Sequence, residues 1–453
     1  MIRKILSYGF VEALTKGLNK LQILILPFLL TTEDYGKIGL LMSVEFLLPF
    51  ITLLGFERTV LRFHNNEHEN IEGFSKTIFT SIKLTHLFVF FGIIVVYGLG
   101  YIDFFGLKLF PDLLMIVVIV YFQSYNRIIL LMYRVEGDHK NYFSSILALQ
   151  LSKFVIVLLT VFLMKSYYGY LIGTLIVSYS INLIFKKRNN KEEKFNINSF
   201  RYLFYFSWPF IFHGLSLNLL GNADKFVIKK YLSFIEVGQY TFIYSFGSML
   251  LFAFLGIAVY MEPLIYQSKT QNIRELNIQK FILISLLSGF IFFLVIEVLN
   301  ISIIPYLYGS KYEEIIPYIS YISMSYLLYP YYLASNYRMI YDKKTKIIAI
   351  TSITSCITAL TLNIVIIPVY GIYGAIIVNF SSYAFQIALF LIVSNKFELK
   401  SELFEFLLVS FLLFGVIYFK LPTYNALIIC FIYMIYIFLI KKQYKILLSS
   451  SDN

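Results

Sequence analysis

YRVEGDHK at residues 133–140 and YRMIYDKK at residues 337–344 place Tyr, Arg, Asp and Lys at the same spacing twice, 204 positions apart. Two other matches occur along the chain, each at an offset of 202 positions: Gly36 with Gly238, and Tyr-Gly at 168–169 with Tyr-Gly at 370–371. Three matches in the same order and at nearly one offset indicate an internal repeat. We expect them in the loops after the first and fourth apolar segments and at the start of the sixth, recurring six segments later.

The composition indicates that this repeat lies in a membrane. Of the 453 residues, 59% are hydrophobic and 14% are charged, and the mean hydropathy is +0.75. Soluble globular chains carry about a quarter charged residues, so a soluble protein of this composition would expose a large apolar surface to water. Because each membrane span needs roughly 20 apolar residues, the chain is long enough for many spans.

Apolar runs separated by short polar loops predict fourteen spans. They are 8–30, 36–56, 76–100, 110–133, 142–164, 168–186, 203–230, 238–260, 280–304, 314–336, 346–368, 371–395, 402–419 and 424–440. Most Lys and Arg residues between spans fall on the side that holds both chain ends, which the positive-inside rule assigns to the cytoplasm. The net charge of +12 is therefore a topology signal and gives no reason to expect a nucleic-acid partner.

The repeat divides these spans into two bundles of an all-α integral membrane protein. We expect an N-terminal six-helix lobe, a cytoplasmic linker, a C-terminal six-helix lobe, two additional transmembrane helices and a cytoplasmic tail. Their bounds are 1–186, 187–201, 202–395, 402–440 and 441–453. Because six is even, both lobes have the same orientation and are expected to be related by an axis along the membrane normal.

Charged residues within the predicted spans are the candidate functional residues, because charge is costly in lipid and usually faces a bundle interior or a water-filled cavity. The N-terminal lobe carries more basic than acidic residues in its spans. The candidate cations of a substrate chamber are Lys16, Lys20, Lys83, Arg127 and Lys153. Such cations suit a phosphate-bearing substrate, since Arg can bind phosphate through two hydrogen bonds and Lys acts as a point charge.

Structural roles compete with this interpretation. Lys83 and Arg127 lie within two turns of the expected cytoplasmic face, where their side chains could extend to water. Lys20 shares a helical face with Glu12 and Lys16 and could pair with Glu12 or Glu45.

Three acidic residues are candidates for coupling transport to protons or sodium: Glu45, Asp224 and Glu297. Internal ion pairing is the alternative for each of them. Asp224 stands next to Lys225 near the outer end of its span, which favours a structural pair.

The sequence offers no metal site, cofactor motif or enzymatic centre. His64 and His68 are four residues apart but lie in a charged loop and lack the His-Glu-x-x-His order. No phosphate-binding G-x-x-x-x-G-K-[ST] string occurs, and the two cysteines, Cys356 and Cys430, lie in separate apolar runs. The expected external loops are too short for a catalytic domain, so we expect no cofactor and no enzyme activity.

Several strings resemble one protein family across residues 5–395. They are Pro27 with LLTTEDYGKIGL at 29–40, YYGYLIGTLIVSY at 167–179, FSWPFIFHGLSLNLLGNADKFVI at 206–228, VGQYTFIYSFG at 237–247 and LNIVIIPVYGIYGAIIVNFSSY at 362–383. They are similar to the bacterial polysaccharide flippases of the multidrug/oligosaccharidyl-lipid/polysaccharide exporter superfamily. The resemblance implies two six-helix lobes in a V-shaped, MATE-like transporter. Lys225 replaces the family's usual Arg after Asp224, and Thr31 and Thr32 stand where a basic residue is often found.

The resemblance also implies an activity. A flippase of this kind moves undecaprenyl-diphosphate-linked O-antigen or capsule repeat units across the bacterial inner membrane by alternating access, with membrane lipids around it. A polysaccharide polymerase and a chain-length regulator are the expected protein partners. The alternatives are a multidrug cation antiporter of the same superfamily, which should favour an acidic chamber, and a flippase for another lipid-linked cell-wall precursor.

Overall fold

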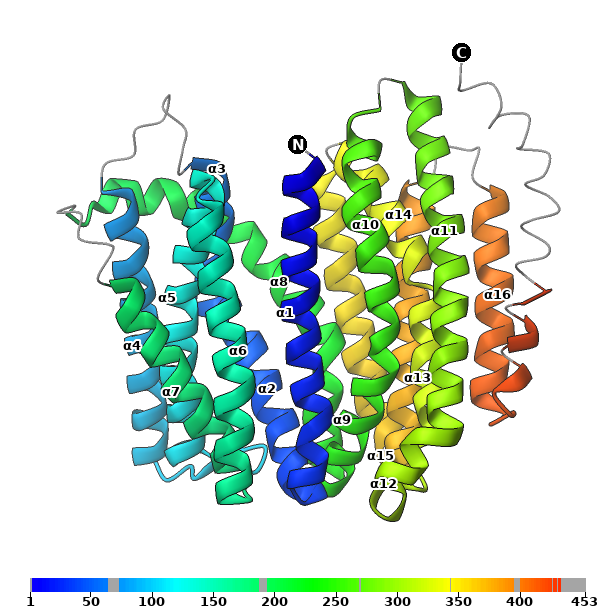
Figure 1. The fold of residues 1–453 in the computed structure, drawn as a ribbon, viewed down its shortest axis with the longest axis horizontal. Helices are drawn as coiled ribbons and strands as arrows, with labels where there is room; N and C mark the ends of the chain where they lie inside the picture. Colours follow the sequence, from blue (N-terminus) through cyan, green and yellow to red (C-terminus); the bar gives the residue numbers. More distant parts are fainter. Residues whose placement is uncertain are drawn as a thin grey trace. The chain divides into compact units, whose positions relative to one another are not determined.

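The structure is a computed structural model and is almost entirely helical in the residues it describes (Figure 1). These residues are 2–63, 73–186, 194–268, 270–342, 344–394, 400–425, 427–429 and 431–432. The first half contains α1 (Ile2–Leu29), α2 (Thr32–Thr52), α3 (Phe56–Phe63), α4 (Phe74–Gly98), β1 (Asp103–Phe104), β2 (Leu107–Lys108), η1 (Leu109–Leu113), α5 (Leu114–Glu136), α6 (His139–Met164), α7 (Tyr167–Lys186) and α8 (Ile197–Tyr231).

The second half continues with α9 (Phe234–Gly247), η2 (Ser248–Leu250), α10 (Leu251–Tyr266), α11 (Gln271–Val298), η3 (Leu299–Ile303), α12 (Ile304–Tyr312), α13 (Tyr318–Leu327), α14 (Tyr329–Tyr341), α15 (Thr345–Ser394) and α16 (Lys400–Tyr418). Contacts divide the chain into two compact units, Met1–Thr241 and Phe242–Asn453. Residues 187–193 of the expected linker, most of the last expected span and the tail at 441–453 lie outside the described residues.

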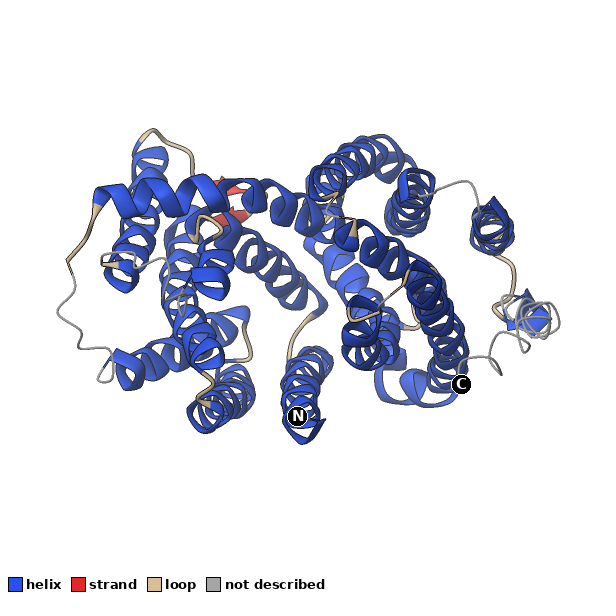
Figure 2. Cartoon of the chain, turned by 90° about the horizontal axis from the view of Figure 1, so that it is seen from above, coloured by secondary structure: helices blue, strands red, loops and turns tan. Residues whose placement is uncertain are grey.

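The first unit is a bundle of long helices. α7 packs against both α5 and α6, while α6 also packs on α1 and α2 packs on α8. Figure 1 shows α1, α4, α5, α6 and α7 running in about the same direction, and Figure 2, seen from above, shows several helices of the chain nearly end-on. One core of buried apolar side chains joins α3, α4 and α8 through Phe56, Ile78 and Leu203. A second joins α5 to α7 through Ile129 and Ile181.

The second unit contains its own helical contacts, with α10 on α11, α14 on α15 and α15 on α16. α15 covers 50 residues, but Gly371 leaves the helical conformation with φ of 60° and ψ of −140°. An uninterrupted helix of this length would be about 75 Å long, far more than the roughly 30 Å of a hydrocarbon core. The break at Gly371 agrees with the expected division between the spans 346–368 and 371–395.

Nine helical stretches among the described residues are long and apolar enough to cross a membrane, and several of them are longer than one span. The chain is therefore a multi-pass membrane protein. The number of fourteen spans stays a prediction.

The repeated octapeptides occupy the same position in the helical order. Tyr133–Lys140 joins the end of α5 to the start of α6, and 337–344 joins the end of α14 to the start of α15. One expectation is wrong: Gly36 and Gly238 are not in loops. Thr31 caps α2 by accepting a hydrogen bond from the Asp34 amide at 3.1 Å, so Gly36 lies inside α2, and Gly238 lies inside α9. The cap begins the helix earlier than the apolar run does.

Candidate functional site

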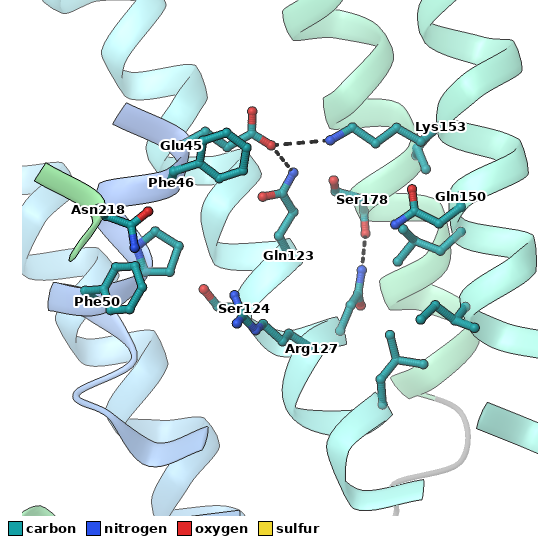
Figure 3. Close-up of a pocket in the computed structure, with 16 residues that line it drawn as sticks. Glu45, Phe46, Phe50, Gln123, Ser124, Arg127, Gln150, Lys153, Ser178 and Asn218 are labelled. Atoms are coloured by element: carbon teal, nitrogen blue, oxygen red, sulfur yellow. Dashed lines mark hydrogen bonds and ion pairs between the residues drawn. The ribbon is translucent and has the colours of Figure 1, made fainter. Parts of the chain in front are cut away.

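A cavity of about 470 Å³ lies within the first unit, between helices α2, α5, α6, α7 and α8 (Figure 3). Its polar and charged wall is made by Glu45, Gln123, Ser124, Asn126, Arg127, Gln150, Lys153, Ser178 and Asn218. The α6 residues that line the cavity, at positions 146, 149, 150 and 153, follow the helical spacing that puts side chains on one face. The rest of the lining is apolar and comes from Phe46, Pro49 and Phe50 of α2, Leu130 of α5, Ile146 and Leu149 of α6 and Val177 of α7.

Glu45 is the centre of a hydrogen-bond network in this cavity. Its side chain is only 7% exposed and accepts from three different helices. Gln123 of α5 donates at 2.6 Å, and the Lys153 ammonium of α6 lies 3.5 Å away (Figure 3). Tyr170 of α7 donates at 2.7 Å. A buried carboxylate is stable when such partners compensate for the water it has lost.

Arg127 is the second cation of the cavity and lies one turn after Gln123 on α5. Its guanidinium pairs with the Glu57 carboxylate of α3 at 2.5 Å, and its side chain is 56% exposed. Arg127 also lines a second cavity of about 270 Å³, together with Arg58, whose guanidinium lies 5.6 Å from the centre of the Phe210 ring. The two cavities share Pro49, Phe50, Arg127 and Asn218, so three cations and two carboxylates surround adjoining spaces.

The other candidate cations lie elsewhere in the same unit. Lys16 and Lys20 are on α1, Lys16 exposed and Lys20 half-buried, and neither lines the two cavities. Lys20 is within electrostatic range of Lys225 of α8. Lys83 borders a separate and mostly apolar groove of about 290 Å³ between α4 and α5, beside the buried His86.

Two of the candidate coupling carboxylates are bound into local networks away from the cavity. Asp224 accepts from the Tyr240 hydroxyl at 2.5 Å and from the Lys225 amide at 2.8 Å, and the Lys225 ammonium lies 3.9 Å away. Glu297, in the second unit, accepts from the Thr423 hydroxyl at 2.8 Å. Only Glu45, of the three candidates, shares a cavity with candidate cations.

Sequence reasoning missed Glu57, Arg58 and Tyr170. Glu57 and Arg58 belong to the polar connection after the second expected span. They line the second cavity because Gly55, with φ of +71°, turns the chain into the short helix α3. The strong segregation of polar and apolar residues in Phe56–Phe63 is a signal that could have indicated this helix. Tyr170 is one of 38 tyrosines, and its role depends on a partner 125 positions away.

Metal binding has no support in the part of the chain that the structure describes, where no group of three His, Cys, Asp or Glu residues could hold an ion. The cavity has the chemistry of a site for an anionic and hydroxyl-bearing ligand. Two buried polar atoms that line it, the Ser124 hydroxyl and the Gln150 carbonyl, have no hydrogen-bond partner within the protein. They are available to a ligand or to water.

A polar, charged cavity lined by apolar, membrane-length helices is typical of a multi-pass membrane transporter. The profile of the family described as "Polysaccharide biosynthesis protein" matches residues 1–269, more than half of the chain. The chain belongs to this polysaccharide biosynthesis family.

Solved structures share the fold. "Lipid II flippase MurJ, inward closed conformation" is 16% identical, with a TM-score of 0.68, over 98% of this chain and 100% of that chain. An inward-facing multidrug resistance MATE family transporter of the MOP superfamily is 11% identical, with a TM-score of 0.62, over 87% of this chain and 96% of that chain. The MATE multidrug transporter DinF-BH is 14% identical, with a TM-score of 0.58, over 85% of this chain and 91% of that chain. No curated protein sequence matches the chain.

These likenesses confirm the predicted all-α transporter fold, and the family match confirms the resemblance seen in the sequence. At these identities the solved structures bear on the fold alone. The substrate must be inferred from the cavity.

Proposed function

We propose that this protein is a flippase that moves undecaprenyl-diphosphate-linked oligosaccharide repeat units, of O-antigen or capsule type, to the outer face of the inner membrane. The observation that carries the proposal is the cavity in which Lys153 and Arg127 share a wall with amide and hydroxyl side chains. Fixed cations suit the diphosphate, and amides suit sugar hydroxyls. Membership of a polysaccharide biosynthesis family supports this class of substrate.

Substrate contacts follow from the two adjoining cavities. Lys153 and Arg127 would hold the diphosphate, with Arg58 as a further cation. Lys16, Lys20 and Lys83 stay predictions as substrate contacts, because they line neither cavity. Alternating access would carry the polar head across the membrane while the prenyl chain stays in lipid. Glu45 is the carboxylate that we favour for coupling to protons or sodium. A polymerase and a chain-length regulator are the proposed partners.

The multidrug antiporter is the less favoured alternative. Three cations against two carboxylates around the cavities would repel a cationic drug. A flippase for another lipid-linked cell-wall precursor needs the same charges. The experiment below distinguishes it by which precursor accumulates.

The test measures lipid-linked oligosaccharide on each membrane face in a strain that lacks this protein. Complete repeat units should accumulate on the cytoplasmic face, and the wild-type gene should restore their export. Lys153→Ala should reduce export at least tenfold at normal protein level, since a buried charge contact is worth more than about 1.4 kcal/mol. Lys140→Ala, which removes an exposed lysine from the same helix α6, is the matched control and should export normally.

Normal export in the deletion strain would refute the flippase. Accumulation of a lipid-linked murein precursor instead would favour the alternative substrate.

A further inference from the structure

Glu45 occupies the place next to Lys153 that an anionic substrate would take. The three contacts of its carboxylate are unequal: Gln123 at 2.6 Å and Tyr170 at 2.7 Å are short hydrogen bonds, while Lys153 at 3.5 Å is the loosest partner. Lys153 is 19% exposed at its side chain and lines the cavity, so it can turn toward a ligand (Figure 3). If it does, Glu45 keeps two hydrogen bonds from other helices.

Arg127 is arranged in a comparable way. Its internal carboxylate, Glu57, pairs with it at 2.5 Å, while its side chain remains 56% exposed. Each cation of the larger cavity therefore already has an internal anion. An incoming ligand binds there only if it compensates for the carboxylate contact that it displaces.

The replacement of an internal carboxylate by a ligand distinguishes ligands by their charge. Anionic phospholipids such as phosphatidylglycerol present one phosphodiester with one negative charge, and anionic lipids make the cytoplasmic leaflet negatively charged. A single phosphodiester that displaces Glu45 replaces one univalent anion by another and leaves a buried carboxylate without its counter-ion, which is unfavourable. A diphosphate diester carries two charges and more acceptor oxygens, so one phosphate can contact Lys153 while the other contacts Arg127. Because the Arg127 side chain is 56% exposed, it can bind that phosphate without leaving Glu57. The diphosphate therefore brings two charges for the one carboxylate contact that it displaces.

We propose that Glu45 is a specificity-determining residue that excludes singly charged phosphodiester lipids from the cavity and admits lipid-linked diphosphates. This inference rests on the proposed function. The Glu45 carboxylate competes with the phosphate of an incoming lipid for the Lys153 ammonium. Such an internal competitor lets the site reject singly charged phospholipids.

The experiment measures binding by native mass spectrometry of the full-length protein in detergent, titrated with two probes. One probe is phosphatidylglycerol and the other is a polyprenyl diphosphate monosaccharide. The wild type should prefer the diphosphate probe. Glu45→Gln keeps the size and hydrogen-bonding ability of the side chain but removes its charge, so it should bind phosphatidylglycerol more tightly and lower the preference about tenfold.

Two variants make the result specific. Glu33→Gln is the matched control, because Glu33 is also on α2 and pairs with a lysine, Lys37, at 2.9 Å, but does not line the cavity. Its lipid preference should equal that of the wild type. Glu45→Asp keeps the buried charge but shortens the side chain by one methylene away from Lys153, and its preference should be intermediate. This variant tests the proposal even if the neutral one is not stably folded.

The outcomes separate the inference from the proposed function. A wild type that prefers phosphatidylglycerol or shows no preference would refute the diphosphate substrate itself. A wild type that prefers the diphosphate, with the same preference in Glu45→Gln and Glu45→Asp, would refute the role of Glu45 alone. Weaker binding of both probes by Glu45→Gln would make Glu45 a direct ligand instead and would also overturn the inference.

Discussion

At the scale of single residues, the same aspartate has different partners in the two repeated octapeptides. Asp138 is the N-cap of α6, accepting a hydrogen bond from the Asn141 amide at 3.1 Å and another from the Asn141 side chain. Asp342 follows the end of α14 and pairs with Arg274 at 3.9 Å and Lys344 at 3.7 Å. The capping hydrogen bond has a normal length, whereas both ion pairs of Asp342 are close to the 4 Å limit, with Asp342 29% and Lys344 35% exposed. Arg274, only 7% exposed, also stacks on the Tyr341 ring, so Asp342 is not its sole partner.

We therefore predict that Asp138→Ala costs about 1 kcal/mol of stability, whereas Asp342→Ala costs less than about 0.5 kcal/mol. Arg274 keeps its stacking on the Tyr341 ring, at 3.8 Å, when Asp342 is removed. The two variants serve as controls for each other. Thermal unfolding midpoints in detergent measure the difference, and an equal or larger loss in Asp342→Ala would contradict the assignment of the cap.

The charged side chains also show how far residue patterns predict the candidate site. Gln123 with Arg127, and Gln150 with Lys153, share helical faces in the sequence, and the structure brings both pairs to one cavity. Lys83 has the same charge but borders a different groove. Helical spacing tells which residues share a face, whereas the neighbour of that face depends on helix packing.

At the scale of helices, α2 and α9 approach so closely that only glycine fits at the contact. A Cβ added at Gly36 would lie 2.0 Å from the carbonyl oxygen of Phe234, and one added at Gly238 would lie 2.1 Å from that of Thr32. The two glycines are equivalent positions of the repeat, and they lie against each other. The matched glycines therefore permit close packing of two helices.

We predict that Gly36→Ala destabilises the protein by about 1–3 kcal/mol, the usual cost of forcing atoms into a packed contact. Gly92→Ala in α4 is the control, because a Cβ there meets nothing within 4 Å, and it should be neutral or slightly stabilising. Thermal unfolding in detergent, compared at equal expression, distinguishes the two. A Gly36→Ala protein as stable as the wild type would show that α2 and α9 do not cross at these glycines.

At the scale of the whole molecule, the orientation in the membrane is the property that the charge distribution predicts. α7 covers 20 residues and is apolar enough to span the bilayer, so its two flanking segments should lie on opposite sides. The predicted topology puts Ser166 outside and Asn198 in the cytoplasm.

Cysteine labelling tests this orientation. In a variant with Cys356 and Cys430 replaced by serine, Ser166→Cys should react with a membrane-impermeant maleimide applied to intact spheroplasts. Asn198→Cys, exposed at the start of α8, should react only after the membrane is permeabilised. The reversed pattern would invert the topology and would place the chain ends outside.

The sequence by itself determined the membrane class, the helical fold, the repeat and the family, because these depend on summed hydropathy and on spacing along one chain. It also indicated Arg127, Lys153 and Glu45 as candidate functional residues, because a charged side chain within a membrane span is costly. Only the tertiary structure decided which charges meet. Glu45 contacts Gln123, Tyr170 and Lys153 from three other helices, up to 125 positions away. Side-chain partners across helices depend on how ridges and grooves pack, and no local pattern in the chain encodes that packing.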